Sequence, residues 1–128
     1  MKRGPHNGRY ILDGKIPVPE PDLLKWAHWM EEDGHRIVRQ DDVGELWVST
    51  CFLGLDHDWT FKGPPMLFET MVFRKSNEED ARGFRRLGFA HVPGHIHLDD
   101  SPVTRTPTWE LALETHAEAV AWAKERLT

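Results

Sequence analysis

Histidine and aspartate side chains are concentrated between residues 91 and 100 of this chain. His95 and His97 are two positions apart, and residues two apart on a β-strand point to the same side of the strand. Imidazole and carboxylate ligands together suit Zn²⁺ and other first-row transition metals. The spacing therefore predicts a metal site, and its candidate ligands are His91, His95, His97 and Asp99.

The run His95-Ile-His97-Leu-Asp99-Asp100 is similar to the HxHxDH box of metallo-β-lactamase-like hydrolases, in which histidines and a carboxylate hold a catalytic metal pair. The run departs from the box at its last position, where Asp100 stands in place of a histidine. What the resemblance implies is a metal-dependent hydrolase. The alternative interpretation is a solvent-exposed loop whose histidines hold no metal.

A second polar group follows the β-rich run 46–53. Asp56, His57 and Asp58 are consecutive, and Glu69 stands in the next apolar run, 66–73. If the two runs pair as a hairpin, Glu69 faces the group, and clustered carboxylates and imidazole can perform general acid–base chemistry. The candidate catalytic residues are then Asp56, His57 and Glu69. The alternative is structural: Asp56 and His57 order the loop, and Glu69 forms a charged pair on a sheet face.

Two other reactive side chains are expected to be structural. His116 lies on the apolar stripe of the last predicted helix, where a single histidine usually has its hydrogen bonds satisfied in the core. Cys51 lies inside a strand with apolar neighbours, which predicts a core position, a raised thiol pKa and no reactivity. The sequence contains no GxSxG elbow, P-loop or Rossmann glycine pattern.

The chain is rich in large aromatic residues, with six Trp and six Phe against a single Tyr. Three of them fall outside the clearest core stripes: Trp29, Trp59 and Phe61. Indole and phenyl rings often form the hot spots of protein interfaces, so these three are candidate protein-binding residues. The alternative is that they close the domain's own core.

Two amphipathic helices are indicated by apolar residues at three- and four-residue spacing. The first covers residues 22–32, with Asp22 as N-cap and Gly34 as its stop. The last begins after Thr108 as N-cap. A capping box formed by Ser76 and Glu79 predicts a shorter helix ending near residue 87.

The strands are predicted at 9–12, 36–40, 46–53 and 66–73, with a short one at 94–98. The turn-forming stretch 41–44 joins the second and third as a hairpin, and apolar residues on both faces of 46–53 indicate a central strand. We therefore expect an α+β fold, an antiparallel sheet of three to five strands with two main helices packed on one face. A single domain is expected over 1–128, with a loose leader at 1–8 and a long insert or loop at 74–107.

Composition excludes some classes of partner. The formal charge of −5 and pI near 5.9 disfavour nucleic acid, although three arginines between 82 and 86 form a local basic patch. No signal peptide and no run of 18 apolar residues is present, so neither membrane insertion nor secretion is expected. The expected location is the cytoplasm.

Several blocks of the chain resemble small uncharacterised proteins of tailed bacteriophages. They are VSTCFLGLDH at 48–57, GPPMLFETMVF at 63–73, RYILDG at 9–14 and TWE at 108–110. The resemblance implies a phage product in a bacterial cytoplasm. We accordingly expect a non-enzymatic protein without a cofactor that binds and modulates a host protein, for example as an inhibitor of a defence-system component. The alternative is the metal-dependent hydrolase.

Overall fold

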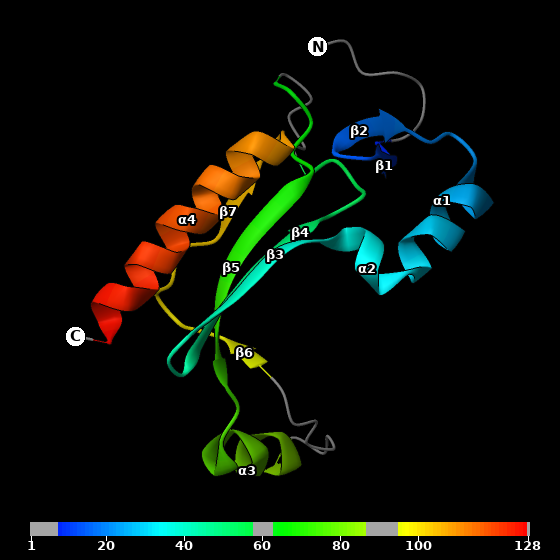
Figure 1. Ribbon diagram of the computed structural model, residues 1–128. Coiled ribbons are helices and arrows are strands. Elements are labelled where there is room, and N and C mark those ends of the chain that lie inside the picture. Colours follow the sequence, from blue (N-terminus) through cyan, green and yellow to red (C-terminus); the bar gives the residue numbers. More distant parts are fainter. Residues whose placement is uncertain (1–7, 58–62, 87–94, 128) are drawn as a thin grey trace.

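The computed structural model describes residues 8–57, 63–86 and 95–127, and it shows an α+β fold (Figure 1). The elements are β1 (Tyr10–Asp13), β2 (Ile16–Pro19), α1 (Leu23–Glu31), α2 (Asp33–Arg36), β3 (Ile37–Val43), β4 (Leu46–Phe52), β5 (Phe68–Lys75), α3 (Glu78–Arg86), β6 (His95–His97), β7 (Thr104–Thr106) and α4 (Trp109–Arg126). Within these ranges, no helix is long and apolar enough to cross a membrane.

The main sheet has five antiparallel strands, and β1 and β2 form a separate hairpin. β4 lies between β3 and β5, which confirms the predicted central strand. β6 pairs with one end of β5 and β7 with the other end. The strand expected at 94–98 is therefore β6, whereas β7 was not predicted because Thr104–Thr106 contains no apolar residue that would mark an alternating pattern.

The β3–β4 hairpin confirms its prediction, but its turn is shorter than expected. Asp41 and Asp42 belong to β3, and Val43 pairs with Leu46, which leaves Gly44 and Glu45 as the loop. A two-residue hairpin loop needs a positive φ at its first position, and Gly44 has a φ of 59°. The apolar packing of Val43 beneath α4 accounts for the continuation of the strand.

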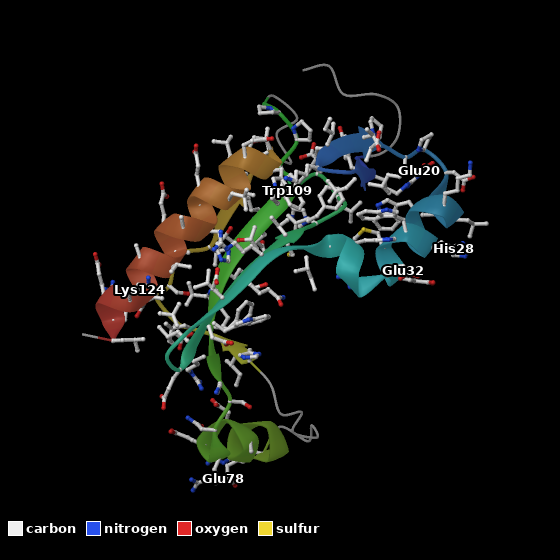
Figure 2. The ribbon with its side chains drawn as sticks, in the orientation of Figure 1. Glu20, His28, Glu32, Glu78, Trp109 and Lys124 are labelled. Carbon is white, nitrogen blue, oxygen red and sulfur yellow. The ribbon has the colours of Figure 1, made fainter. Side chains whose placement is uncertain are left out.

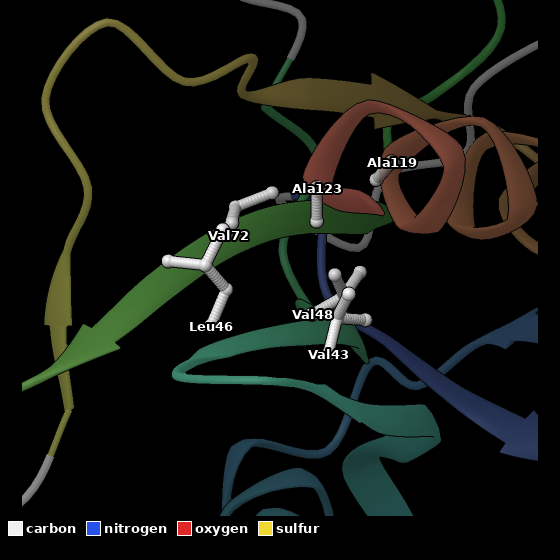
Figure 3. Packing of buried hydrophobic residues seen from close by; sticks show 6 residues of the cluster. All are labelled: Val43, Leu46, Val48, Val72, Ala119 and Ala123. Atoms are coloured by element: carbon white, nitrogen blue, oxygen red, sulfur yellow. The ribbon is translucent and has the colours of Figure 1, made fainter. Parts of the chain in front are cut away.

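One face of the main sheet packs against α4 and forms the core. Alternate residues of β4, beginning with Leu46 and Val48, are buried on this face. They meet Ala119 and Ala123 of α4, whose small side chains let the helix approach closely (Figure 3). A second cluster continues the core toward the start of α4, and it consists of Tyr10, Phe52, Leu67, Phe68 and Ala112.

The expectation that Cys51 lies in the core was wrong. Cys51 occupies the opposite face of β4 from Phe52 and is half-buried there. Burial, and then the nearby Glu69 carboxylate, raise the pKa of its thiol. The direction of that pKa shift is the predicted one, although the side chain faces away from α4.

The predicted N-caps of α1 and α4 are confirmed, but the predicted stop of α1 and the predicted cap of α3 are wrong. Asp22 accepts hydrogen bonds from the backbone N–H groups of the first turn of α1, and Thr108 does the same for α4. Gly34 does not stop α1, because the extended backbone of Glu32 ends that helix and Gly34 falls inside α2. At α3, the side chains of Asn77 and Asp80 exchange hydrogen bonds with each other's N–H groups, one position later along the chain than the expected Ser76 and Glu79.

Candidate functional site

The sheet face turned away from α4 carries a row of half-buried side chains that we call the open face. It consists of Trp47, Ser49 and Cys51 from β4 and of Glu69, Met71 and Phe73 from β5. Strand alternation places these residues opposite the buried ones. In the described part of the chain, the helix that lies along the sheet is α4, on the other side (Figure 1).

Four rings at one end of the open face form an aromatic cluster: Trp47, Phe73, His95 and His97. Trp47 and Phe73 are paired residues of β4 and β5, and their ring centroids lie 5.3 Å apart. His95 stacks on the Trp47 ring with a centroid distance of 4.3 Å and an interplanar angle of 26°. His97 is paired with Phe73 and meets its ring edge-on at 6.2 Å. The pairing of three strands therefore gathers the cluster.

The other end of the open face is charged. The Nε of Arg105 on β7 lies 2.9 Å from Oε2 of Glu69 on β5. The two residues are directly paired across the strands, and the Glu69 side chain is only 14% exposed. This ion pair fixes β7 against β5 and leaves the guanidinium at the rim.

The structure places the predicted metal ligands as follows. His95 and His97 lie on the same side of β6, as their spacing predicted. His95 stacks on Trp47, and Nε2 of His97 lies 3.1 Å from Oγ of Ser101. Asp99 is exposed in the turn after β6, and His91 lies outside the described residues. Across the described ranges, no three His, Cys, Asp or Glu side chains come together as a metal site, so the metal site remains a prediction.

Asp56 and His57 lie at the base of the loop between β4 and β5. Oδ1 of the buried Asp56 accepts a hydrogen bond from the N–H of Met66 at 3.0 Å. The backbone N–H of Asp56 donates to the carbonyl of Gly8. The N–H of His57 donates to the carbonyl of Met66. These contacts join the ends of the loop, and Glu69 is held by Arg105. The general acid–base role therefore stays a prediction, and Asp58 lies outside the described residues.

Of the three predicted aromatic anchors, only Trp29 lies within the described ranges. It is half-buried, meets Phe52 edge-on at 5.6 Å and stacks on His35 at 4.7 Å. Trp29 thus holds α1 against the core, as the alternative interpretation had it. Trp59 and Phe61 lie in the segment 58–62, outside the described residues.

The sequence did not single out the aromatic rings of the open face. Trp47 and Phe73 lie in runs that are apolar at nearly every position, so alternation alone did not show which side α4 covers. The available signal was weak: Ser49 and Glu69 are polar and share the face with Trp47. Only the pairing register of β4 and β5 shows that these polar residues share a face with Trp47.

A buried polar chain connects α4 to the sheet. His116, 1% exposed, places Nδ1 2.8 Å from Oγ1 of Thr50 and Nε2 2.7 Å from Oδ2 of Asp41. The Thr50 hydroxyl lies 2.7 Å from that of Thr70. An Asp–His–Thr set matches the residue types of a nucleophilic triad, but Thr50 is completely buried and shares its hydroxyl with Thr70. This set of hydrogen bonds is therefore structural, and it orders the core.

Comparisons of this chain with protein-family models, curated proteins and solved structures found no match. The open face offers rigid aromatic surface at one end and a fixed ion pair at the other.

Proposed function

We propose that this protein binds a protein partner through its open face, with the aromatic cluster at the centre of the contact. The observation that carries the proposal is the stacked pair Trp47 and His95 on a face along which no described helix lies. Rings that pack on one another at a surface present apolar area that a partner can cover.

The residue types of the open face suit an interface core. Trp, Phe and Met are enriched at the centres of interfaces and charged residues are depleted there. Trp47, Met71 and Phe73 lie side by side on two hydrogen-bonded strands, so their positions are set before a partner arrives. Fewer side-chain rotamers then need to be frozen on binding, which favours affinity.

The charges around the cluster favour one kind of partner. Exposed acidic residues outnumber the cation beside it. Asp42 is paired with Trp47, Glu45 lies in the β3–β4 turn, and Asp99 and Asp100 follow β6, whereas Lys75 is paired with His95. Complementary potentials increase the rate of association and select the partner. A protein surface with a basic rim matches this distribution, whereas a phosphate backbone is repelled by it.

The expected partner is a protein of a bacterial host, which the phage protein would modulate by covering its surface. What supports the phage origin is the likeness of the sequence blocks to small proteins of tailed bacteriophages. Modulation by occlusion requires neither a substrate nor a cofactor. An inhibitor of a host defence component is one function of this kind.

The proposal is tested by capture from a bacterial lysate followed by titration of the purified partner. Trp47→Ala should weaken binding by about tenfold or more, which is the usual effect of losing an interface hot spot. Trp122→Ala is the matched control, since Trp122 is a half-buried indole on α4. Equal affinity of the wild type and Trp47→Ala would reject the open face as the contact.

A separate variant tests whether the acidic residues around the aromatic cluster contribute to binding. Asp42→Lys should slow association with the same partner, because it replaces a rim carboxylate with a cation. Retrieval of nucleic acid in place of protein, with binding lost at high salt, would contradict the choice of partner.

The metal-dependent hydrolase remains the alternative, and it has one supporting observation. His95 and His97 lie on the same side of β6, the arrangement that two ligands of one metal need. Zinc binding would draw His95 away from Trp47 and change the indole fluorescence. A near-stoichiometric metal in tag-free protein that is lost in the His95→Ala, His97→Ala double variant would favour this alternative.

A further inference from the structure

A hollow of about 410 Å³ lies between the β1–β2 hairpin, the segment before β5 and the start of α4, and we call it the α4 pocket. Its walls are mainly apolar, and they include Tyr10, Ile16, Pro17, Pro65, Leu67 and Trp109. Figure 2 shows Trp109 at the first turn of α4, beside the hairpin. The α4 pocket and the aromatic cluster are at opposite ends of the sheet, because Leu67 packs with Phe52 whereas Trp47 lies near the start of β4.

The shape of the pocket is held by rigid groups. Proline rings have a fixed φ and few rotamers, and several prolines line the walls. Trp109 meets Phe68 of the core edge-on at 6.2 Å, which holds the indole in place. Pockets of this size that are largely preformed and apolar are typical small-molecule sites.

Two charged side chains define the polar side of the pocket. The Nζ of Lys15, from the β1–β2 turn, lies 5.8 Å from the centroid of the Trp109 ring. Glu110 is the acidic residue among the pocket-lining side chains. An ammonium group held beside an indole face can pair with an anion, and because Lys15 is exposed the attraction is that of a surface ion pair.

We propose that the α4 pocket binds a small amphipathic anion, a molecule with a planar apolar body and one carboxylate, sulfonate or phosphate group. The planar body lies against Trp109 and the proline walls, and the anionic group pairs with Lys15. Glu110 lowers the affinity for such an anion and sets its orientation, because the anionic group must turn away from the carboxylate. This site is separate from the open face and does not depend on the proposed function.

The experiment titrates the full chain with anilinonaphthalene sulfonate, a fluorescent aromatic anion. The wild type should show one saturable site. Lys15→Met should weaken binding roughly two- to fivefold, the usual effect of losing an exposed ion pair. Glu110→Gln should strengthen binding by a similar factor, since it removes a like charge. A general loss of protein stability would not weaken binding in Lys15→Met and strengthen it in Glu110→Gln, so opposite effects would be due to the charges themselves.

The apolar half of the site has its own variants. Trp109→Ala should weaken binding about tenfold or more, and Trp122→Ala, farther along α4, should leave it unchanged. Because Trp109 also packs on Phe68, Ile16→Glu is a second variant that avoids the core. Ile16 is 67% exposed at the pocket, and the added carboxylate should repel the probe.

Three outcomes would overturn the proposal. One is the absence of saturable binding to the folded wild type. Another is binding that Lys15→Met, Glu110→Gln and Ile16→Glu all leave unchanged. The third is loss of binding in Trp47→Ala with retention in Ile16→Glu, which would place the probe on the open face. None of these outcomes bears on whether a protein partner binds the open face.

Discussion

The Nδ1 atom of His116 lies 2.8 Å from Oγ1 of Thr50, although the two residues are 66 positions apart in the chain. Asp41 lies at the other ring nitrogen, and a carboxylate there accepts a hydrogen bond, so Nε2 carries the hydrogen. In the neutral ring, Nδ1 then accepts from the Thr50 hydroxyl. This chain of hydrogen bonds joins α4 to β3 and β4 beneath the helix.

Replacement of His116 should destabilise the fold. His116→Phe keeps a ring of similar size but removes the hydrogen bonds to Thr50 and Asp41, which retain Thr70 and Arg39 as partners, so the expected cost is about 1 kcal/mol for each lost bond. Urea unfolding measures the change. His28→Phe, at an exposed position of α1, is the control and should stay within about 0.5 kcal/mol of the wild type. Equal effects of the two substitutions would show that the buried chain adds no stability.

The Asp41 carboxyl group should make the free energy of unfolding depend on pH in the acidic range. The hydrogen bond from His116, followed by that from Arg39, holds the pKa of the Asp41 carboxyl below its usual value. The ionised carboxylate therefore stabilises the fold at pH values above the unfolded pKa of about 3.9, and this stabilisation is lost as the pH falls through the lower folded pKa.

The measurement compares the wild type with Asp41→Asn by urea unfolding at neutral and at acidic pH. The stability difference should be largest at neutral pH and should shrink below about pH 4. Asp42→Asn is the matched control because Asp42 lies on the opposite face of β3 from Asp41. A difference that grows on acidification would contradict the assigned direction of the shift.

Alanine substitutions at two glycines distinguish the cost of backbone strain from the cost of side-chain crowding. Gly54 and Gly14 both have positive φ, +75° and +62°, so alanine at either should cost roughly 1–2 kcal/mol. A Cβ at Gly54 would also lie 2.6 Å from the end of the Met30 side chain, whereas nothing lies within 4 Å at Gly14. Gly54→Ala should therefore cost about 1 kcal/mol more than Gly14→Ala.

Denaturant unfolding of both glycine variants measures this difference. In a Met30→Ala background, the extra cost at Gly54 should largely disappear, because the crowded side chain is gone. If the cost stays the same in that background, contact with Met30 is not its cause.

Helix α3 should depend on one ion pair. Arg74 on β5 makes two hydrogen bonds of 2.7 Å to the carboxylate of Asp80, and this contact raises the pKa of the guanidinium. Arg74→Met should speed amide hydrogen exchange in α3 by about fivefold, the effect of one partly exposed ion pair. Exchange in β4 should not change. Arg82→Met, at an exposed position of α3, is the control, and equal acceleration by both would contradict the role of Arg74.

The elements of the fold were predictable where the signal is local. The caps Asp22 and Thr108 act on backbone groups within one turn of their own helix, so neighbouring residues suffice to recognise them. The turn at Gly44 and the apolar run of β4 likewise act over a few positions. Such features gave the α+β class and the hairpin correctly.

The candidate site was predictable only in part. The spacing of His95 and His97 correctly placed them on the same side of a strand, because alternation is a property of the backbone. Their contact with the rings of Trp47 and Phe73 depends on how β6 pairs with β5, and nothing in residues 95–97 specifies that pairing. Cys51 was misplaced for the same reason, since its run is apolar on both faces.

The sequence by itself determined the longer helices and strands, since that information lies in periodicity, caps and turns, whereas the short elements β2, α2 and β7 were not predicted. Only the tertiary structure decided which side of the sheet α4 covers, and with it which rings remain on the open face. The same packing brought His116 to Thr50 and Arg105 to Glu69. These contacts depend on strand register and helix docking, which are set by the burial of the whole core and not by any short run of residues.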